Sequence, residues 1–339
     1  MGNQTGKAQL YIAVEQMSAE AGSEISGLVH MNVSSTFKAK SLVFEFSGTE
    51  RCRFGNSGIK CKGTKICMSI ENWNGNKLQQ GQYSYPFRFA IPNTVPGSFK
   101  VSSSSLSAEV AYFAKCYLLN KNGKKEAKDK TSILVYQAID LDRFSIKNID
   151  RIPVQKCCCN YGTSVIEAKC EKNAYMPSEL VKVIIEVNNS QCKASIDRLE
   201  CCLYRTMRLA GKAQKVKVVR EKLHSSSTRK RIPGGISLLS EQAIQVEINL
   251  ESIFDQIQYA ATTRAKLVEC NYSIDVTAHF GDFASTQSLG TIIMPTQTTL
   301  PGREVPTAPS GEWNPLVMEC AYINERNSNI FEPSAPEED

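Results

Sequence analysis

The feature that most constrains the fold is an internal repeat with an offset of 155 residues. Sliding the chain on itself by that offset superimposes eight identical residues within the 33 positions from Ala13 to Glu45, without a gap. Apolar positions correspond as well, for example Leu10 with Val165 and Phe44 with Leu199. Eight identities are several times what average residue usage gives by chance. The repeat predicts two domains of similar topology, and the length of 339 residues allows each to bury its own core.

Short alternating segments indicate strands in both halves. Residues 83–91 alternate strictly between large apolar and smaller or polar side chains, as in a strand with one buried face. Pro92 ends this strand and Pro96-Gly97 supplies a turn. Because Pro86 has no backbone N–H, the strand is expected at a sheet edge, or to leave its pairing there. No apolar period of 3.6 residues persists over a dozen residues. The chain is therefore predicted to be all-β, with antiparallel, immunoglobulin-like β-sandwiches.

Several runs resemble the arrestin family. The stretch YSYPFRFAIPNTVPGSF resembles the family's proline-flanked aromatic strand and PGSF turn. The runs AIDLDRFSI, KCCCN and LVECNYSIDV are similar to the inter-domain linker and C-terminal domain of α-arrestins. The resemblance covers most of the chain. It implies tandem β-sandwiches at 6–148 and 152–298, joined near 140–153 and followed by a tail at 299–339. It also implies a non-enzymatic cytoplasmic adaptor that brings membrane cargo to ubiquitin and vesicle machinery.

The charge is distributed unevenly between body and tail. Residues 303–339 carry eight acids and two arginines, a net −6, which leaves 38 bases against 26 acids in residues 1–302, a net +12. A basic body with an acidic tail predicts either an anionic partner for the body or a tail that folds back as an internal competitor. Two merely solvated surfaces would give the same counts. The tail is rich in Pro, Ser, Asn and Glu and is expected to be mostly disordered.

The tail holds two copies of the tetrapeptide P[ST]AP. They are Pro306-Thr307-Ala308-Pro309 and Pro333-Ser334-Ala335-Pro336. This pattern matches the peptide bound by the ubiquitin-E2-variant domain of ESCRT-I, in which prolines preset an extended conformation at low entropic cost. Two copies in one short tail predict ESCRT-I as a partner and raise avidity for a multimeric partner, although an accidental Pro-rich linker is the alternative.

One departure from the family bears on the mechanism. Many α-arrestins carry PPxY motifs that engage WW domains of ubiquitin ligases, and this chain has no PP dipeptide. Direct recruitment of a ligase is therefore not predicted, while coupling to ESCRT-I is.

A basic run occupies residues 211–231 and contains a single acid, Glu221. Alternation within an expected strand places Lys215 and Lys217 on one face and Val216 and Val218 on the other, so the basic face is predicted to be exposed. We interpret the run as a site for an anionic lipid headgroup or phosphate, or else as a solvated strand and loop. Nucleic acid is not predicted, because aromatic residues are not interleaved. The candidate residues are Lys212, Lys215, Lys217, Arg220, Arg229, Lys230 and Arg231.

Signals for catalysis and metal binding are missing from the sequence. There is no GxSxG, HExxH, P-loop or GxGxxG motif, no CxxC pair, and His30, His224 and His279 are widely scattered. The 13 cysteines include the clusters 157–159 and 201–202, which suit buried small side chains or occasional palmitoylation better than redox catalysis. No cofactor and no metal are expected.

Two further segments carry hypotheses about the ends of the chain. Gly2 matches the N-myristoylation signal only in part, because Gly6 stands where Ser or Thr is required, and incorporation of labelled myristate would test it. The apolar segment 313–323 is expected either to return as a strand onto the first sandwich, to be displaced on activation, or to act as a linear motif. No leader peptide is evident, so a cytoplasmic protein, peripheral to the plasma membrane or endosomes, is expected.

Three functions are compatible with these observations. The main prediction is an adaptor for endocytic and endosomal protein transport that links membrane cargo or a membrane surface to ESCRT-I. A structural coat subunit akin to the arrestin-like subunit of retromer is the first alternative, and it predicts constitutive partners and a dispensable tail. An enzyme acting through clustered thiols is the second, and it predicts a lowered cysteine pKa.

Overall fold

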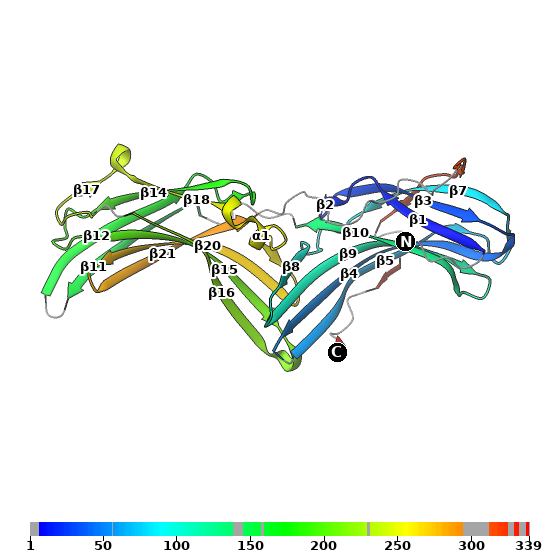
Figure 1. Ribbon diagram of the computed structural model, residues 1–339, viewed down its shortest axis with the longest axis horizontal. Helices are drawn as coiled ribbons and strands as arrows, with labels where there is room; N and C mark the ends of the chain where they lie inside the picture. The colour runs from blue at the N-terminus through cyan, green and yellow to red at the C-terminus, as the bar shows by residue number, and fades with distance from the viewer. Residues whose placement is uncertain are drawn as a thin grey trace.

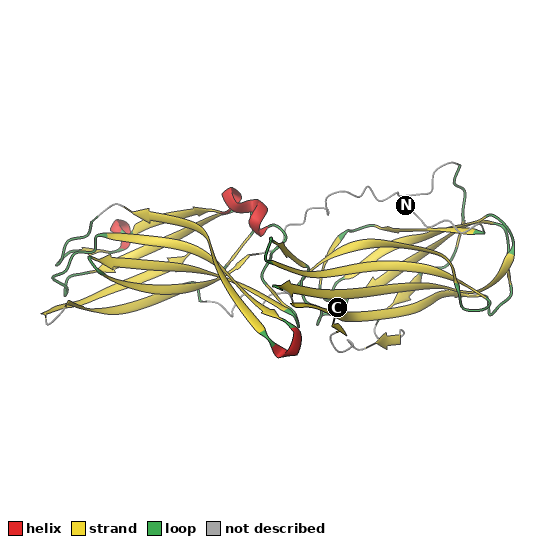
Figure 2. Ribbon diagram, turned by 60° about the horizontal axis from the view of Figure 1, so that its bottom comes forward, coloured by secondary structure: helices red, strands yellow, loops and turns green. Residues whose placement is uncertain are grey.

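The chain forms two β-sandwiches that lie end to end and meet at an angle (Figure 1). This computed structural model describes residues 7–55, 57–137, 145–156, 159–228, 231–293, 312–324, 329–331 and 337–338. Strands dominate both halves, and the helices are short (Figure 2). The predicted all-β class with two tandem sandwiches is confirmed.

The first sandwich consists of two sheets. One has the strand order β1-β3-β7 and is extended beyond β7 by the tail. The other has the order β2-β10-β9-β4-β5, with β6 on β4, β8 on β9 and tail strands on β5. The bounds are β1 (Ala8–Val14), β2 (Ser18–Glu20), β3 (Glu24–Val33), β4 (Phe37–Phe54), β5 (Ser57–Asn72), β6 (Lys77–Leu78), β7 (Gly81–Ala90), β8 (Phe99–Ser102), β9 (Leu106–Asn120) and β10 (Lys125–Tyr136).

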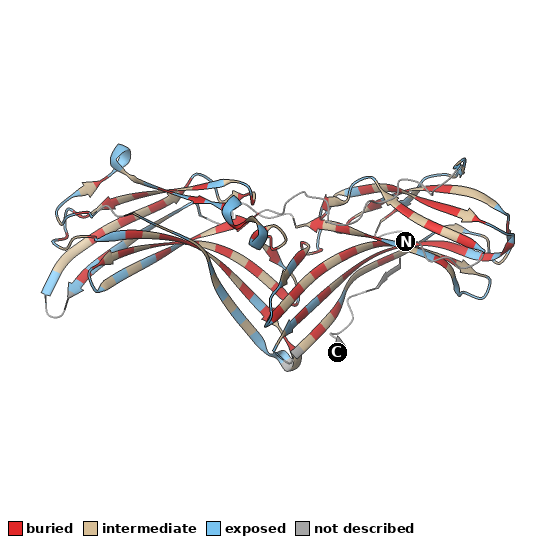
Figure 3. Ribbon diagram, viewed as in Figure 1, coloured by how far each residue is buried: buried red, intermediate tan, exposed pale blue. Residues whose placement is uncertain are grey.

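Aromatic side chains from both sheets form the core of this sandwich. Phe44 packs on Phe87 with ring centroids 4.7 Å apart, and Phe46 packs on Phe89 at 4.8 Å. All four rings are at most 1% exposed. The alternation of buried and less buried residues runs along the strands of both halves (Figure 3). The aromatic strand predicted from residues 83–91 therefore supplies core residues, as the period of two requires.

The second sandwich is built in the same way. One sheet has the order β11-β12-β14-β17, with β18 also on β14, and the other has the order β13-β21-β20-β15-β16, with β19 on β20. The strands are β11 (Lys147–Lys156), β12 (Cys159–Cys170), β13 (Ala174–Tyr175), β14 (Leu180–Asn188), β15 (Arg198–Ala210), β16 (Val216–Thr228), β17 (Ser237–Leu238), β18 (Ile244–Asn249), β19 (Thr263–Arg264), β20 (Val268–Phe280) and β21 (Phe283–Ile293). The helical elements are η2 (Lys212–Gln214), η3 (Ser240–Gln242), η4 (Leu250–Ile253) and α1 (Phe254–Ile257).

The internal repeat corresponds to equivalent strands. An offset of 155 residues carries β1 onto β12, β3 onto β14 and β4 onto β15. The repeated pair Glu45 and Glu200 also has equivalent partners, because Lys65 on β5 lies 3.4 Å from Glu45 and Lys222 on the corresponding strand β16 bonds Glu200 at 3.1 Å. Burial alone would raise the pKa of Glu45, but Lys115 and Lys65 outweigh it and the pKa is lowered. Both copies thus keep a carboxylate within the sheet by pairing it.

Hydrogen bonds from neighbouring side chains hold the second copy of this glutamate ionised. Cys202, Ser225 and Lys222 donate to Glu200 and lower its pKa to about 2. The repeated glutamates are therefore parts of the sheets rather than an isolated pair of acids, and they do not form an acid/base site.

The boundary between the domains differs from the expectation. Strand β11 begins at Lys147 and pairs with β12 from Lys147↔Lys169 onward. The second sandwich therefore starts before residue 152, and Pro153, expected in the linker, lies opposite Thr163 within this strand pair. Proline is tolerated there because β11 is an edge strand.

Hydrogen bonds between described residues and the contact of two hairpins join the two sandwiches. The backbone N–H of Leu267 donates to Glu50 at 2.7 Å and that of Lys100 donates to the Tyr259 carbonyl at 2.7 Å. Thr263 bonds the Gly97 carbonyl, and the Arg264 N–H bonds the Gln137 side chain. The tips of the β4–β5 and β15–β16 hairpins also meet (Figure 1). No helix in the described part of the chain is long and apolar enough to cross a membrane.

Candidate functional site

The tail pairs with the edge of β7 that does not face β3. Strand β22 (Leu316–Val317) pairs in parallel with Tyr83 and Ser84, and β23 (Ala321–Ile323) pairs in parallel with Phe87–Phe89. This places the segment 313–323 on the first sandwich, which confirms the first of its two predicted fates. Its displacement on activation stays a prediction.

Pro86 explains why two tail strands are found instead of one. The carbonyl of Ser84 accepts from the N–H of Met318 at 2.9 Å, so the backbone groups of Ser84 face the tail. Backbone groups of every second residue in a strand point to the same side, so those of Pro86 also face the tail. Proline has no N–H to donate there. The pairing breaks between β22 and β23 at this point. Of the two predicted outcomes for Pro86, a sheet edge or a loss of pairing at that point, the structure shows the second, because β7 lies between β3 and the tail strands.

Side chains anchor the tail at both ends of the β7 contact. Ile323 is 0% exposed and belongs to the hydrophobic core, and Met318 packs against that core. Trp313 lies edge-on to the His30 ring, with centroids 5.3 Å apart. The Gln82 side chain donates to the Glu312 carbonyl at 3.2 Å and accepts from the Asn314 N–H at 2.9 Å. The tail is thus held by core burial as well as by backbone pairing.

The outer edge of β5 carries the end of the tail. Strand β24 (Asn329–Phe331) pairs antiparallel with Lys65–Cys67, and β25 (Glu337–Glu338) pairs antiparallel with Ile59 and Lys60. The acidic tail therefore folds back onto a strand that carries Lys60, Lys62 and Lys65. This agrees with the internal-competitor alternative drawn from the charge asymmetry.

Several predicted site residues lie outside the described part of the chain. These are both P[ST]AP tetrapeptides (306–309 and 333–336), Gly2, Arg229, Lys230 and the hinge residues 140–143. The second tetrapeptide is nevertheless flanked on both sides by described strands, β24 and β25.

The basic run forms the edge strand β16, but its faces are the reverse of the prediction. Val216 and Val218 are 47% and 62% exposed, whereas Lys217 is half-buried with its amino group 6.0 Å from the centroid of the Phe54 ring. The inward face is covered by protein: Phe54 at the tip of the first sandwich contacts Lys217, and further along the strand Val219 and Leu223 pack against the hydrophobic core. Strand β16 has exposed residues along its length (Figure 3).

At least three of the six described lysines and arginines of this run are paired with acids. Arg220 bonds Asp275 and stacks on Tyr204, and Lys222 bonds Glu200 at 3.1 Å. Arg231 lies 3.5 Å from Asp197, and Lys212 is also engaged. Acidic residues of the same sandwich therefore neutralise part of the positive charge of this run. Lys215 is exposed at the end of η2.

The one acid of the run has a structural role. Glu221 accepts two hydrogen bonds from Arg205, at 3.1 and 2.6 Å, and Arg205 also donates to the Gln256 carbonyl at 2.6 Å. The Arg205 side chain is only 7% exposed. A buried guanidinium needs such partners, because an unpaired charge is costly in the interior.

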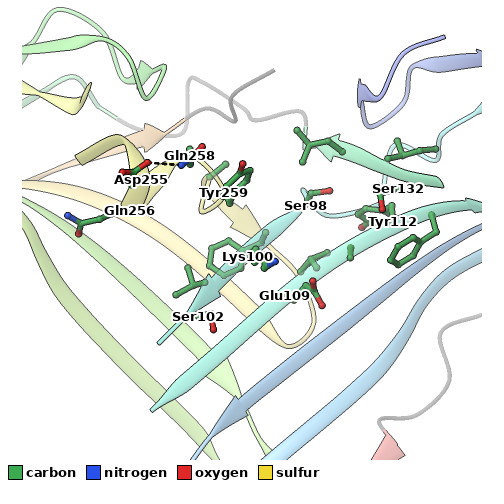
Figure 4. A pocket seen from close by; sticks show the side chains of 18 of the residues that line it. Ser98, Lys100, Ser102, Glu109, Tyr112, Ser132, Asp255, Gln256, Gln258 and Tyr259 are labelled. Carbon is green, nitrogen blue, oxygen red and sulfur yellow. Dashed lines mark hydrogen bonds between the residues drawn. The ribbon is translucent and has the colours of Figure 1, made fainter. Parts of the chain in front are cut away.

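A cavity of about 700 Å³ lies between the sandwiches. Its labelled side chains come from residues 98–102, β9 and β10 on one side and from residues 255–259 on the other, where Gln258 donates to Asp255 at 3.1 Å (Figure 4). Both signs of charge line it, with Lys100 and Arg205 opposing Glu109 and Asp255. No single ligand class matches this mixture. No sequence pattern predicts the cavity, because it exists only once both sandwiches are in place.

Burial raises the pKa of several thiols, away from the range in which a thiolate forms readily. Burial raises the pKa of Cys201 to about 12 and that of Cys170 to about 11. Burial also raises the pKa of Cys202. Cys159 is exposed, while Cys157 and Cys158 lie outside the described residues. Within the described residues, no group of three His, Cys, Asp or Glu side chains is placed to hold a metal ion.

Comparison with known proteins matches both halves of the chain. Residues 10–142 match the family model "Arrestin (or S-antigen), N-terminal domain", and residues 160–296 match "Arrestin (or S-antigen), C-terminal domain".

Two curated proteins are similar to the chain. "Arrestin domain-containing protein A" of Dictyostelium discoideum is 22% identical over 229 residues, which cover 60% of this chain and 38% of that protein. Human "Arrestin domain-containing protein 5" is 24% identical over 191 residues, which cover 51% of this chain and 54% of that protein. The chain thus spans about half or less of the length of these relatives.

Proposed function

The chain belongs to the arrestin-domain family, and from that premise we propose that it is a trafficking adaptor whose tail recruits ESCRT-I and whose two sandwiches engage membrane cargo. The observation that carries this proposal is the recurrence of P[ST]AP at 306–309 and 333–336. Extended, proline-rich peptides bind at low entropic cost, and two copies raise the effective concentration for a second binding event.

The placement of the tail supports an adaptor. Residues 312–324 are held on the first sandwich, so the tail stays close to the body at that point. The raised pKa values of Cys201 and Cys202, one of the two cysteine clusters, give no support to thiol catalysis. We place the adaptor in the cytoplasm, at the surface of endosomes or the plasma membrane.

A localisation experiment tests the linkage between cargo and ESCRT-I. A fluorescent fusion of the whole chain should overlap with ESCRT-I on endosomes. The double variant Pro306→Ala/Pro333→Ala should lose that overlap, because both peptide anchors are gone. Pro301→Ala, in the same tail but outside both motifs, is the matched control. Unchanged overlap for the double variant would instead favour a coat subunit whose tail is dispensable.

Anionic phospholipid is a second proposed partner of the body. The charge of +12 in residues 1–302 supports it, while the ion pairs of Arg220, Lys222 and Arg231 limit the charge that β16 can offer. We expect weak flotation with vesicles containing phosphoinositide. Lys215→Glu should lower the bound fraction severalfold at low salt, since each base near a membrane contributes about 1 kcal/mol. Glu241→Gln, in the exposed η3 turn, is the control. Equal flotation of wild type and Lys215→Glu would remove this lysine from the proposed lipid site.

A further inference from the structure

Strand β16 closes its sheet with an open backbone edge. It is the outermost strand, bonded to β15 on one side, and no other strand in the described part of the chain pairs with it (Figure 1). Strand β18 lies nearby in the facing sheet but pairs with β14. The pairing of β16 with β15 is regular from Val216 to Lys222 and is interrupted by a bulge at Leu223. A regular, unpaired edge of this length can accept a further strand.

The hydrogen-bond pattern shows which residues of β16 face this open edge. The N–H of Ala210 donates to the Leu267 carbonyl at 2.9 Å, so the backbone groups of Ala210 point away from β16. The register partner of Ala210 is Val216. Antiparallel pairs alternate between bonded and non-bonded, so the backbone groups of every second residue from Val216 onward point away from β15. The residues concerned are Val216, Val218, Arg220 and Lys222.

The side chains of the same residues lie together on the outer face of the sheet. Val216 and Val218 are 47% and 62% exposed, and Arg220 and Lys222 are exposed as well. Each base has an acidic partner within the sheet. That partner uses only part of its capacity, because a guanidinium has five N–H donors and an ammonium has three. An added strand can therefore gain apolar contact at one end and charge-assisted hydrogen bonds at the other.

The equivalent edge of the first sandwich is already occupied by an acidic strand. Strand β5 is the counterpart of β16, because the repeat carries β4 onto β15 and each is the next strand in its sheet. Arg51 lies opposite Lys60, and Thr206, 155 positions after Arg51, lies opposite Arg220. Lys60 and Arg220 thus hold equivalent positions. The tail strand β25 pairs antiparallel with β5 and places Glu337 opposite Lys60.

We propose that the edge from Val216 to Lys222 binds an extended acidic segment of a partner protein as an added antiparallel strand. This inference rests on the proposed function, because the segment belongs to the membrane cargo that the sandwiches engage. Antiparallel pairing places the first half of the segment opposite Lys222 and Arg220 and the second half opposite Val218 and Val216. The recognised pattern is therefore acid-x-acid-x-apolar-x-apolar, in which β-branched apolar residues are favoured.

Charge and hydrogen bonding separate this occupant from two others. A second copy of β16 brings its own Arg220 and Lys222 to the edge, together with Lys215, and the like charges oppose such pairing. A lipid surface does not present alternating donors and acceptors at the spacing of a strand, so it leaves the backbone groups of the edge unmatched.

A synthetic peptide tests the inference on the whole chain. The probe is a capped peptide with the core Glu-Thr-Glu-Thr-Val-Thr-Val, and its matched control has Lys in place of both Glu residues. Fluorescence anisotropy should show that the control binds at least about tenfold more weakly, because two attractive cross-strand pairs become repulsive.

Methyl groups on the peptide backbone test whether the added strand pairs. In the predicted register the N–H groups of the Glu and Val residues face β16, and those of the Thr residues face away. Methylation of the second Glu and first Val nitrogens should weaken binding at least about tenfold, because two hydrogen bonds are lost. Methylation of two Thr nitrogens is the control and should change the affinity less than about threefold.

Hydrogen exchange and a substitution in β16 locate the site. The amides of Val216, Val218, Arg220 and Lys222 should exchange fast in the free chain and slowly with the acidic peptide. Val218→Pro removes one donor from the open edge and leaves the pairing with β15 in place. It should weaken peptide binding at least about fivefold. Val218→Thr keeps the N–H and is the control. The methylated peptides decide the question if Val218→Pro does not fold.

Several results would overturn the edge site. They are the absence of binding by the acidic peptide, equal binding of the acidic and basic peptides, and equal binding of the two methylated peptides. Protection of the four amides by dimerisation of the chain, or by phosphoinositide vesicles without peptide, would assign the edge to another occupant. Titration with the ubiquitin-E2-variant domain tests the tail separately. Failure of the edge site therefore leaves the linkage to ESCRT-I standing, and failure of that linkage leaves the peptide result unchanged.

Discussion

Ile323→Asp is expected to release the tail from β7 and to lower the free energy of unfolding of the first sandwich. Ile323 is completely buried in the core, and a carboxylate placed there would have no partner among the described core residues around it. Loss of a buried isoleucine side chain alone costs about 2–5 kcal/mol, and an unpaired charge adds to that. The tail can avoid the cost by undocking. The decrease in the free energy of unfolding therefore cannot exceed the free energy with which the tail docks on β7.

Denaturant unfolding together with hydrogen exchange measures this prediction. Amides of 316–323 should lose protection in Ile323→Asp, and the midpoint of the first unfolding transition should fall. Tyr322→Asp is the matched control, because Tyr322 is adjacent and 46% exposed, and it should change neither observable appreciably. If Ile323→Asp behaves like Tyr322→Asp, residue 323 does not anchor the tail.

Glu221→Gln is expected to destabilise the second sandwich by about 2–3 kcal/mol. The substitution keeps the shape of the side chain but removes the charge that balances Arg205, which is held in the interior at 7% exposure. Breaking one side of a buried ion pair costs about 3–5 kcal/mol, and we expect a cost below that range because Glu221 is 35% exposed and the Gln256 carbonyl still accepts from Arg205.

The control for this prediction lies on the next residue of the same strand. Lys222→Gln removes the exposed ion pair with Glu200, and a surface pair of this kind contributes little. Equilibrium unfolding in urea should show a clear loss for Glu221→Gln and a much smaller one for Lys222→Gln. Equal effects would mean that Glu221 contributes to β16 only as a surface charge.

The fold could be predicted because its signals are local. The period of two in residues 83–91, the turn at Pro96-Gly97 and the missing donor at Pro86 each act within a few residues, and the 155-residue repeat extended them to a second domain. The predicted start of the second sandwich at residue 152 was too late, because the polar and proline-containing sequence of β11 is typical of a linker. Only the pairing with β12 shows that it is a strand.

The surfaces were harder to predict, because they depend on which segments come together. The faces of β16 were assigned in reverse, since alternation gives two faces but does not say which one packs against the rest of the protein. Lys217 faces Phe54 although a lysine was expected in solvent. The docking of 329–331 and 337–338 on β5 had only one signal in the sequence, the opposite charges of tail and body. Charge alone does not determine which strand the tail pairs with or in which register.

The central claim is that the tail recruits ESCRT-I through its two tetrapeptides, and calorimetric titration of the purified ubiquitin-E2-variant domain into the whole chain tests it most directly. The wild-type chain and the Pro301→Ala control should bind the domain alike. The Pro306→Ala/Pro333→Ala chain should lose more than about tenfold in affinity, because both prolines that preset the bound conformation are gone. Equal binding of the wild-type and doubly substituted chains would contradict the account.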